Sequence, residues 1–219
     1  MVNIIDKKLI SKDNKIFIAG HNGMAGKAIC RSLSNKGYSN LLTVEKKKLN
    51  LLDINSVNDW FSHYKPDVVI LAAAKVGGIQ ANNKYPADFI LQNLKIQTNV
   101  IENSWENNVK KFLFFGSSCI YPKLSPQPIK EEYLLSGALE ETNEPYAIAK
   151  IAGLKLCSAL NRQHKFNAIS LMPTNLYGPG DNYNLNTSHV LPAFINRFHK
   201  AKIRGEKKVK CWGSGNPQR

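Results

Sequence analysis

Short apolar runs alternate with longer stretches of helical periodicity along most of the chain. The apolar runs are predicted strands, because they are short and are bounded by glycine, proline or polar residues; they cover residues 15–20, 40–44, 66–74, 109–118 and the start of 167–180. The stretches between them place apolar residues three and four positions apart and are predicted helices at 24–37, 54–64, 85–107 and 145–164. This alternation predicts a parallel sheet covered on both faces, a doubly wound, Rossmann-like α/β fold.

Several predicted helices carry signals at their ends. Gly37 is placed to end the first helix, and Asn55 or Ser56 to cap the second. Pro86 and Pro145 fall in the first turns of the two long helices, where the missing proline N–H costs nothing.

A glycine-rich loop follows the first strand directly and opens the first helix. Residues 20–26 read GHNGMAG, with glycines at 20, 23 and 26. Such a loop allows a tight turn, a close approach of backbone to a diphosphate and close packing of helix on strand, while the helix N-terminus donates N–H groups to phosphate. We therefore expect a dinucleotide to contact Gly20, His21, Asn22, Gly23, Met24, Ala25 and Gly26. The alternative is a glycine-rich turn without a ligand.

The end of the second strand bears on which dinucleotide binds. Glu45 there would accept the ribose hydroxyls of NAD, whereas the lysines that follow it, Lys46 above all, suit the 2′-phosphate of NADP. Asp53 would either receive the adenine amino group or cap the following helix.

A tyrosine and a lysine stand four residues apart in the last predicted helix. This spacing places Tyr146 and Lys150 on one helix face, one turn apart. An ammonium group, together with a cationic nicotinamide ring, is expected to lower the pKa of the phenol, which then exchanges a proton with a carbonyl oxygen. Ser117, at the end of a neighbouring strand, is placed to hydrogen-bond the same oxygen.

Composition and charge narrow the classes of function. The net charge is +14 in 219 residues, but the lysines are scattered and Lys46–Lys48 has no aromatic platform beside it. A solvated surface with some cations serving a polyanionic small ligand is therefore expected rather than nucleic-acid binding.

No apolar run is long enough for a membrane span, and the first 15 residues lack the apolar segment of a secretory signal. The four cysteines form no CxxC pair or metal-ligand spacing, so free thiols, no metal site and a cytoplasmic protein are expected.

Longer motifs give the sequence a resemblance to a known family. They read FIAGHNGMAG, LNLLD, LAAAKVGGIQANNKYPADFI, GSSCIYPK, TNEPYAIAKIAG, MPTNLYGPGDN, SHVLPAFINRFH and WGSGNPQR, and extend from Lys15 to the last residue. They resemble the extended short-chain dehydrogenase/reductases, and among these the enzymes that act on GDP-4-keto-6-deoxy-D-mannose. The resemblance implies an NADP(H)-dependent 3,5-epimerase and 4-reductase that forms GDP-L-fucose.

The resemblance also implies roles for individual residues. Cys119 and His189 would move the protons at C3 and C5, for which a thiolate and an imidazole are suited, whereas Cys30 and Cys157 are expected in the core. The other implied contacts are, for the cofactor, Asn50, Leu51, Phe115, Gly116, Ser117, Ser118, Lys150, Pro173, Thr174, Asn175, Leu176 and His189, and for the substrate, Arg197, Trp212 and Arg219. The family loop commonly has arginine where this sequence has Asn22, which places more weight on Lys46 for the 2′-phosphate.

The same resemblance implies how the chain is divided into domains. We expect a lead-in at 1–14, an NADP-binding domain at 15–182 and, at 183–219, the beginning of a substrate-binding domain that is cut short, leaving apolar surface exposed. A homodimer through the two long helices is expected. The alternatives are a related GDP-keto-deoxysugar or heptose reductase, and a truncated NADP-binding protein without catalysis.

Overall fold

A five-stranded parallel sheet forms the centre of the protein. The computed structural model describes residues 10–185 and 187–211. The strands are β1 (Ile16–Ala19), β2 (Leu41–Leu42), β3 (Val68–Leu71), β4 (Lys111–Phe115) and β5 (Ala168–Leu171). They lie in the order β2-β1-β3-β4-β5, with every neighbouring pair parallel, which confirms the predicted Rossmann-like sheet.

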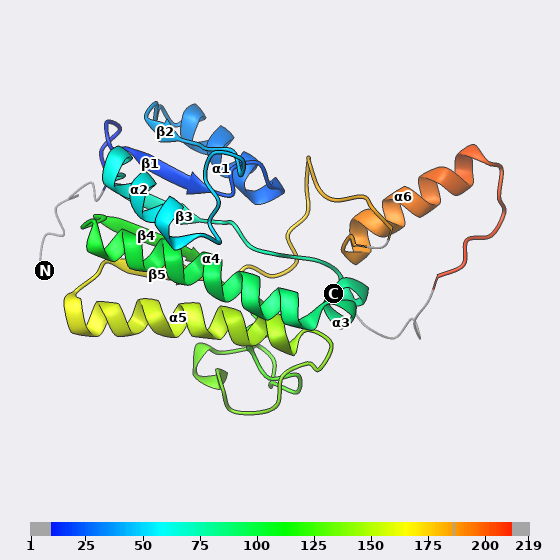
Figure 1. The fold of residues 1–219 in the computed structure, drawn as a ribbon. Helices are drawn as coiled ribbons and strands as arrows, with labels where there is room; N and C mark the ends of the chain where they lie inside the picture. The colour runs from blue at the N-terminus through cyan, green and yellow to red at the C-terminus, as the bar shows by residue number, and fades with distance from the viewer. Residues whose placement is uncertain (1–9, 186, 212–219) are drawn as a thin grey trace, which may run out of the picture.

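The helices are α1 (Met24–Asn35), α2 (Ile54–Tyr64), α3 (Ile79–Lys84), α4 (Pro86–Glu106), α5 (Glu144–His164) and α6 (Val190–Ile203), with short 3₁₀ helices at Ser118–Ile120 and Glu131–Tyr133. The helices that connect successive strands cover the sheet, whereas α6 follows the last strand and lies away from the sheet in Figure 1. Figure 1 shows α2, α4 and α5 side by side along one face of the sheet.

Each face of the sheet has its own apolar cluster. Phe17, Phe112 and Phe114 pack with side chains of α2, α4 and α5 on one face, and Cys157 of α5 is buried among them, as expected. On the other face, Ile16 and the alternate residues of β1 and β3 pack against α1, where Cys30 is half-buried.

Part of this second face is not covered by the residues that the structure describes. Ile169 and Leu171 of β5 lie on it and are each 45% exposed. The expectation of exposed apolar surface is confirmed at this strand, which forms the edge of the sheet.

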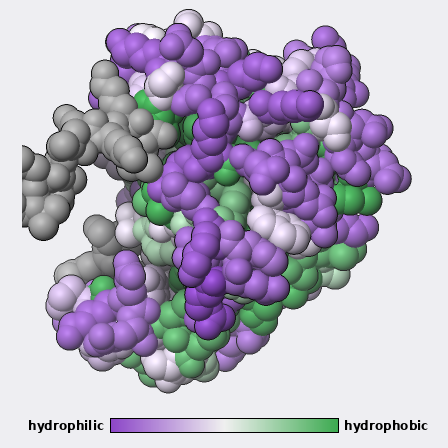
Figure 2. All heavy atoms as spheres, turned by 90° about the vertical axis from the view of Figure 1, so that its left-hand side faces the viewer, coloured by the Kyte–Doolittle hydropathy of each residue, from purple (hydrophilic) through white to green (hydrophobic). Residues whose placement is uncertain are grey.

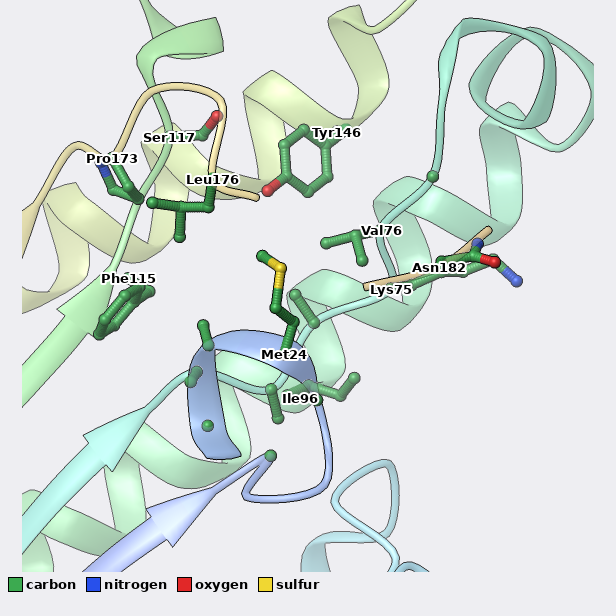
Figure 3. A pocket seen from close by; sticks show the side chains of 18 of the residues that line it. Met24, Lys75, Val76, Ile96, Phe115, Ser117, Tyr146, Pro173, Leu176 and Asn182 are labelled. Atoms are coloured by element: carbon green, nitrogen blue, oxygen red, sulfur yellow. The ribbon is translucent and has the colours of Figure 1, made fainter. Parts of the chain in front are cut away.

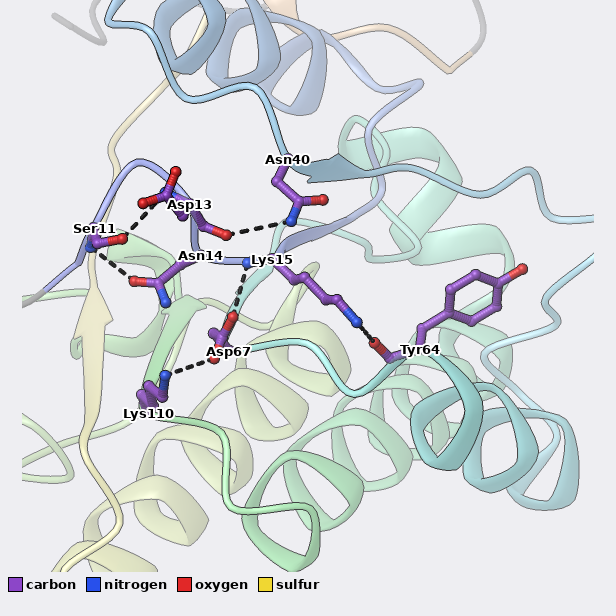
Figure 4. Close-up of polar contacts among 8 residues, drawn as sticks. All are labelled: Ser11, Asp13, Asn14, Lys15, Asn40, Tyr64, Asp67 and Lys110. Carbon is purple, nitrogen blue, oxygen red and sulfur yellow. Dashed lines mark hydrogen bonds and ion pairs between the residues drawn. The ribbon is translucent and has the colours of Figure 1, made fainter.

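A half-buried carboxylate joins segments at the amino ends of the strands. Asp67, just ahead of β3, accepts hydrogen bonds from the backbone N–H of Lys15 at 2.9 Å and from Nζ of Lys110 at 2.8 Å, and Nζ of Lys15 donates to the carbonyl of Tyr64 (Figure 4). Burial alone would raise the pKa of Asp67, but the bonds from Lys110 and Lys15 outweigh it and lower the pKa. Figure 2 faces this end, where hydrophilic side chains cover much of the surface.

The ends of the elements differ from the sequence prediction in specific places. The predicted strand 66–74 pairs only over 68–71 and the predicted strand 109–118 only over 111–115. Single backbone bonds continue past both strands, from the N–H of Ala72 to the carbonyl of Ala19 and from the N–H of Gly116 to the carbonyl of Leu171. Asn55 and Ser56 were wrong as caps of α2, because Asp53 is the N-cap and its side chain accepts from the N–H of Asn55.

Other signals at helix ends are confirmed or lie one residue away. Pro86 and Pro145 lie in the first turns of α4 and α5, as predicted. The C-cap of α1 is Lys36, and Gly37, which was predicted there, is the next residue, with a φ of +81°. The six-residue α3 was not predicted, because it lies between a Gly-Gly pair and a proline and is too short for a periodic pattern.

Candidate functional site

The carboxyl ends of the strands open into a cavity of about 850 Å³. Ligands of doubly wound sheets bind at this edge. Figure 3 shows side chains entering the cavity from several elements, with Tyr146 on one side, Met24 below and Val76 opposite Phe115. The cavity is lined by these residues predicted from the sequence: 20–26, Lys46, Asn50, Leu51, 115–119, Tyr146, Lys150, 173–176 and His189.

The glycine loop forms the part of the cavity below the sheet edge. Gly20 has a φ of +92°, and a Cβ there would lie 2.6 Å from the backbone N of Ala73. A Cβ on Gly26 would overlap the carbonyl oxygen of Gly20. Gly23 is the N-cap of α1, so the free N–H groups of the first helical turn lie at the cavity wall. The glycines thus allow the loop backbone to pack closely against the segment after β3 and against α1. Its N–H groups at the start of α1 are of the kind that bind a diphosphate.

The turn after β2 separates an acidic residue from a basic one. The carbonyl of Glu45 accepts from the N–H groups of Lys48 and Leu49, at 2.9 and 3.0 Å, which closes the turn. Lys46 lines the cavity, whereas Glu45 faces a second, smaller hollow of about 430 Å³ beside Trp60. The cation, and not the carboxylate, therefore lines the cavity that contains the whole dinucleotide loop. Asp53 does not line either hollow and serves as the helix cap.

A hydroxyl and a thiol follow β4 in succession. Ser117 is the N-cap of the 3₁₀ helix 118–120, and its Oγ accepts from the N–H of Cys119 at 3.3 Å. This short helix turns the chain back toward the cavity. Cys119 is half-buried and lines the cavity, in contrast to the buried Cys157.

Tyr146 and Lys150 enter the site from the first two turns of α5. The ring of Tyr146 lies edge-on to Phe89, with centroids 6.5 Å apart. Lys150 is only 3% exposed, and its Nζ donates to the carbonyl oxygen of Phe115 at 2.7 Å. The same Nζ lies 5.9 Å from the centroid of the Tyr146 ring. The spacing of four thus brings the phenol and the ammonium together, with the lysine tied to the end of β4.

Burial displaces the pKa values of both members of this pair. Burial lowers the pKa of Lys150 from 10.5 to about 8. Burial also raises the pKa of Tyr146, the negative charge of a Cys119 thiolate would add to this rise, and the hydrogen bond with Ser117 opposes it. Without a bound cofactor, desolvation therefore determines the direction of the tyrosine pKa shift. The expected lowering includes the charge of a cationic nicotinamide ring and stays a prediction for the protein with its cofactor.

His189 and the residues around it form the far wall. His189 is the N-cap of α6 and lines the cavity with Asn182 and Thr187. Arg197 lies half-buried on α6 and is not among the cavity residues. Trp212 and Arg219 lie outside the residues that the structure describes.

Sequence reasoning missed one wall of the cavity. Residues 72–79, which follow β3, line it together with Asn82. Their only signal in the sequence is position, because the run AAAKVGG follows a buried strand and so must reach the carboxyl edge of the sheet.

Within residues 10–185 and 187–211, no group of three or more His, Cys, Asp or Glu side chains is arranged to hold a metal ion. None of the helices in that part of the chain is long and apolar enough to cross a membrane.

Known proteins resemble the chain over nearly all of its length. It is 58% identical over 208 residues to GDP-L-fucose synthase 1 of Arabidopsis thaliana, covering 95% of this chain and 64% of that protein. A solved GDP-L-fucose synthetase from Naegleria fowleri bound to NADP superposes with a TM-score of 0.84 at 31% identity, covering 96% of this chain and 69% of that one. A GDP-6-OMe-4-keto-L-xylo-heptose reductase from C. jejuni gives a TM-score of 0.87 at 42% identity, covering 90% and 57%.

The chain thus spans less than two thirds of the length of its Arabidopsis relative. Residues 16–219 match the family described as NAD dependent epimerase/dehydratase. With its parallel sheet, its glycine loop and its Tyr-Lys pair at one cavity, the chain belongs to the NAD dependent epimerase/dehydratase family.

Proposed function

We propose that the protein is an NADP(H)-dependent enzyme that epimerises GDP-4-keto-6-deoxy-D-mannose at C3 and C5 and reduces it at C4, forming GDP-L-fucose. One observation carries the proposal: a hydroxyl, a thiol, a phenol, an ammonium and an imidazole line one cavity that also contains a dinucleotide loop. The relatives named as GDP-L-fucose synthases support the choice of sugar.

The residues present fit NADP(H). Residues 20–26 form a tight turn, since a Cβ at Gly20 or Gly26 would collide with backbone. This turn lines the cavity with the first turn of α1, where a diphosphate would bind, and Lys46 supplies a cation for the 2′-phosphate. Asn50, Leu51 and Pro173–Leu176 line the same cavity and would hold the two ends of the dinucleotide. When bound, NADPH supplies the hydride for the sugar C4. The solved relative bound to NADP supports this assignment.

The epimerisation uses the acidity of protons next to a ketone. Cys119 and His189 would remove a proton from C3 or C5 and return one to the opposite face, and the enolate oxygen at C4 would be held by Tyr146 and Ser117. In the reduction Tyr146 gives a proton to the same oxygen. Lys150, close to the phenol, favours its ionised form once the cationic nicotinamide ring also acts on it.

Substrate contacts outside the cavity are part of the proposal. We assign the GDP moiety to residues 183–219, where Arg197, Trp212 and Arg219 match substrate contacts of the family. An arginine offers a planar set of donors to a diphosphate and an indole offers a packing surface.

A second candidate is a related GDP-heptose reductase, favoured by the likeness to the C. jejuni enzyme. A reductase needs the phenol, the lysine and the dinucleotide but no proton transfer at C3 and C5. The thiol of Cys119 and the imidazole of His189 at the same cavity support the epimerase instead.

The deciding experiment is turnover in deuterated water. The purified protein is mixed with GDP-4-keto-6-deoxy-D-mannose and NADPH, and deuterium at C3 and C5 is followed by mass spectrometry and NMR while NADPH oxidation is followed by absorbance. The proposal predicts both deuterium uptake and NADPH oxidation.

Cys119→Ser should slow deuterium uptake at least about 100-fold and leave NADPH affinity unchanged, since a positioned acid or base contributes about that much. Cys30→Ser, a cysteine outside the cavity, is the matched control. Oxidation without uptake in the parent protein would favour the reductase.

Assembly and location complete the proposal. We propose a homodimer through α4 and α5, on which Leu91 and Ile148 are exposed, and a cytoplasmic protein. A monomer by light scattering at micromolar concentration would contradict the dimer.

A further inference from the structure

Two walls of the cavity meet at a close contact of backbone on backbone. The N–H of Gly78, in the loop after β3, donates to the carbonyl of Thr187 at 3.1 Å. A Cβ on Gly78 would lie 2.5 Å from the carbonyl oxygen of Ser188, so no larger residue fits without moving one of the segments. Figure 1 shows the consequence at the level of the fold, with α3 next to the beginning of α6.

Asn82 holds the loop side of this contact. It is 7% exposed, and its Nδ2 donates to the carbonyls of Gly77 at 2.8 Å and Gly78 at 3.1 Å. Its backbone N–H also donates to the carbonyl of Gly78 at 3.1 Å. Three bonds from one residue thus fix the two glycines, which would otherwise be the most freely rotating part of the wall.

The other side of the contact leads directly to His189. Thr187 and Ser188 precede it, and His189 begins α6 as its N-cap without a capping hydrogen bond from its imidazole. The place of the imidazole at the cavity therefore depends on the backbone that carries it. Two residues before His189, the carbonyl of Thr187 accepts the hydrogen bond from the N–H of Gly78.

We infer that Gly78 and Asn82 are positioning residues for His189, an inference that rests on the proposed epimerase for what the imidazole does to substrate. Asn82 fixes the glycine turn, and the turn fixes residues 187–188. His189 is thereby held at the cavity that Cys119, in the 3₁₀ helix 118–120, also lines.

Each side of this contact also contains a buried polar atom. Oδ1 of Asn82 and Oγ of Ser188 are buried and have no hydrogen-bond partner among the described residues. Buried polar groups are rarely left unpaired in folded proteins.

The test compares Asn82→Ser and Gly78→Ala with Asn83→Ser. Serine at 82 is too short to reach both carbonyls, and alanine at 78 pushes against Ser188. Asn83 is the exposed neighbour of Asn82 and does not line the cavity, so it controls for the chemistry of the substitution. Circular dichroism and NADPH titration first establish that each variant is folded; if Gly78→Ala does not fold, Asn82→Ser decides the question.

The first readout needs no substrate. The chain has five histidines, so their imidazole ¹H–¹³C resonances are resolvable by NMR, and His189→Gln identifies the one from His189. Its shift and its titration with pH should change in Asn82→Ser and Gly78→Ala and stay as in the parent protein in Asn83→Ser. An unchanged His189 resonance in both folded variants would overturn the inference, as would an equal change in Asn83→Ser.

The second readout is deuterium uptake into the keto sugar. In Asn82→Ser and Gly78→Ala, kcat for exchange should fall at least about 10-fold with NADPH affinity unchanged, because a misplaced proton donor affects the proton transfers and not cofactor binding. Parent-like exchange in a variant whose His189 resonance has moved would refute the link to catalysis. If the parent protein exchanges no protons at all, the proposed function has failed, and the NMR comparison still decides whether the two residues position His189.

Discussion

Lys150 gives the sharpest test of how burial shapes this site. Its Nζ is almost completely shielded from water and donates to the carbonyl oxygen of Phe115 at 2.7 Å. Burial lowers its pKa from 10.5 to about 8 because the charged ammonium has lost its hydration. The perturbation is Lys150→Met, which removes the titrating group and keeps a long side chain. Lys155→Met, at an exposed position on the same helix, is the control.

The magnitude follows from the two pKa values. A fall from 10.5 to about 8 corresponds to about 3 kcal/mol against the charged form in the folded state. Below pH 8 the folded and unfolded chains both carry the proton, so this cost is fully present. As the pH rises above 8 the folded protein releases the proton while the unfolded chain keeps it, so the folded state binds fewer protons and stability rises. Between pH 7 and pH 9.5 this one group should add about 2 kcal/mol to the free energy of unfolding.

The assay is urea unfolding at pH 7, 8, 9 and 9.5, without cofactor, for the parent protein and both variants. The scan stops there because burial raises the pKa of Tyr146, so ionisation of that tyrosine in the unfolded chain would oppose the effect near pH 10. The difference in unfolding free energy between parent and Lys150→Met should grow with pH by about 2 kcal/mol, while the difference from Lys155→Met stays constant. Parallel curves for the parent and Lys150→Met would refute the claim that burial displaces the lysine pKa.

Two further predictions concern the dinucleotide loop and the amino ends of the strands. Gly26→Ala should weaken NADPH binding at least about 10-fold in a fluorescence titration, because a Cβ would overlap the carbonyl oxygen of Gly20 and widen the loop; Ser32→Ala, exposed on the same helix, should bind as the parent does. Asp67→Asn should lower the free energy of unfolding by about 1–2 kcal/mol at pH 7 by removing the charged bond to Lys110. The lowered pKa of Asp67 means that its contribution is present above the pKa of about 3.9 of an unfolded aspartate and is lost as the pH falls through the folded value, so the difference should shrink below pH 4. A difference that persists at pH 3 would contradict this.

What the sequence by itself determined is mostly local. Residues 16–19 and 68–71 are continuous apolar runs because they form the middle of a sheet that is covered on both sides, and the helical spacing of α1, α2, α4 and α5 follows from the face that each helix buries. The glycine spacing of residues 20–26 and the Tyr146–Lys150 spacing could likewise be interpreted directly, because each is a pattern within one loop or one helical turn, although the backbone of Ala73 that crowds Gly20 belongs to another segment.

Tertiary structure decided everything that depends on contacts between distant segments. The burial that lowers the pKa of Lys150 and, without a cofactor, raises the pKa of Tyr146 comes from packing α5 on β4. The turn at Glu45 decides that Lys46, and not the carboxylate beside it, faces the cavity. The contact of Gly78 with Thr187 lies between residues 109 positions apart in the chain, beyond the reach of any local pattern. Periodicity reports which face of an element is buried, but desolvation and backbone contact depend on which other element covers that face.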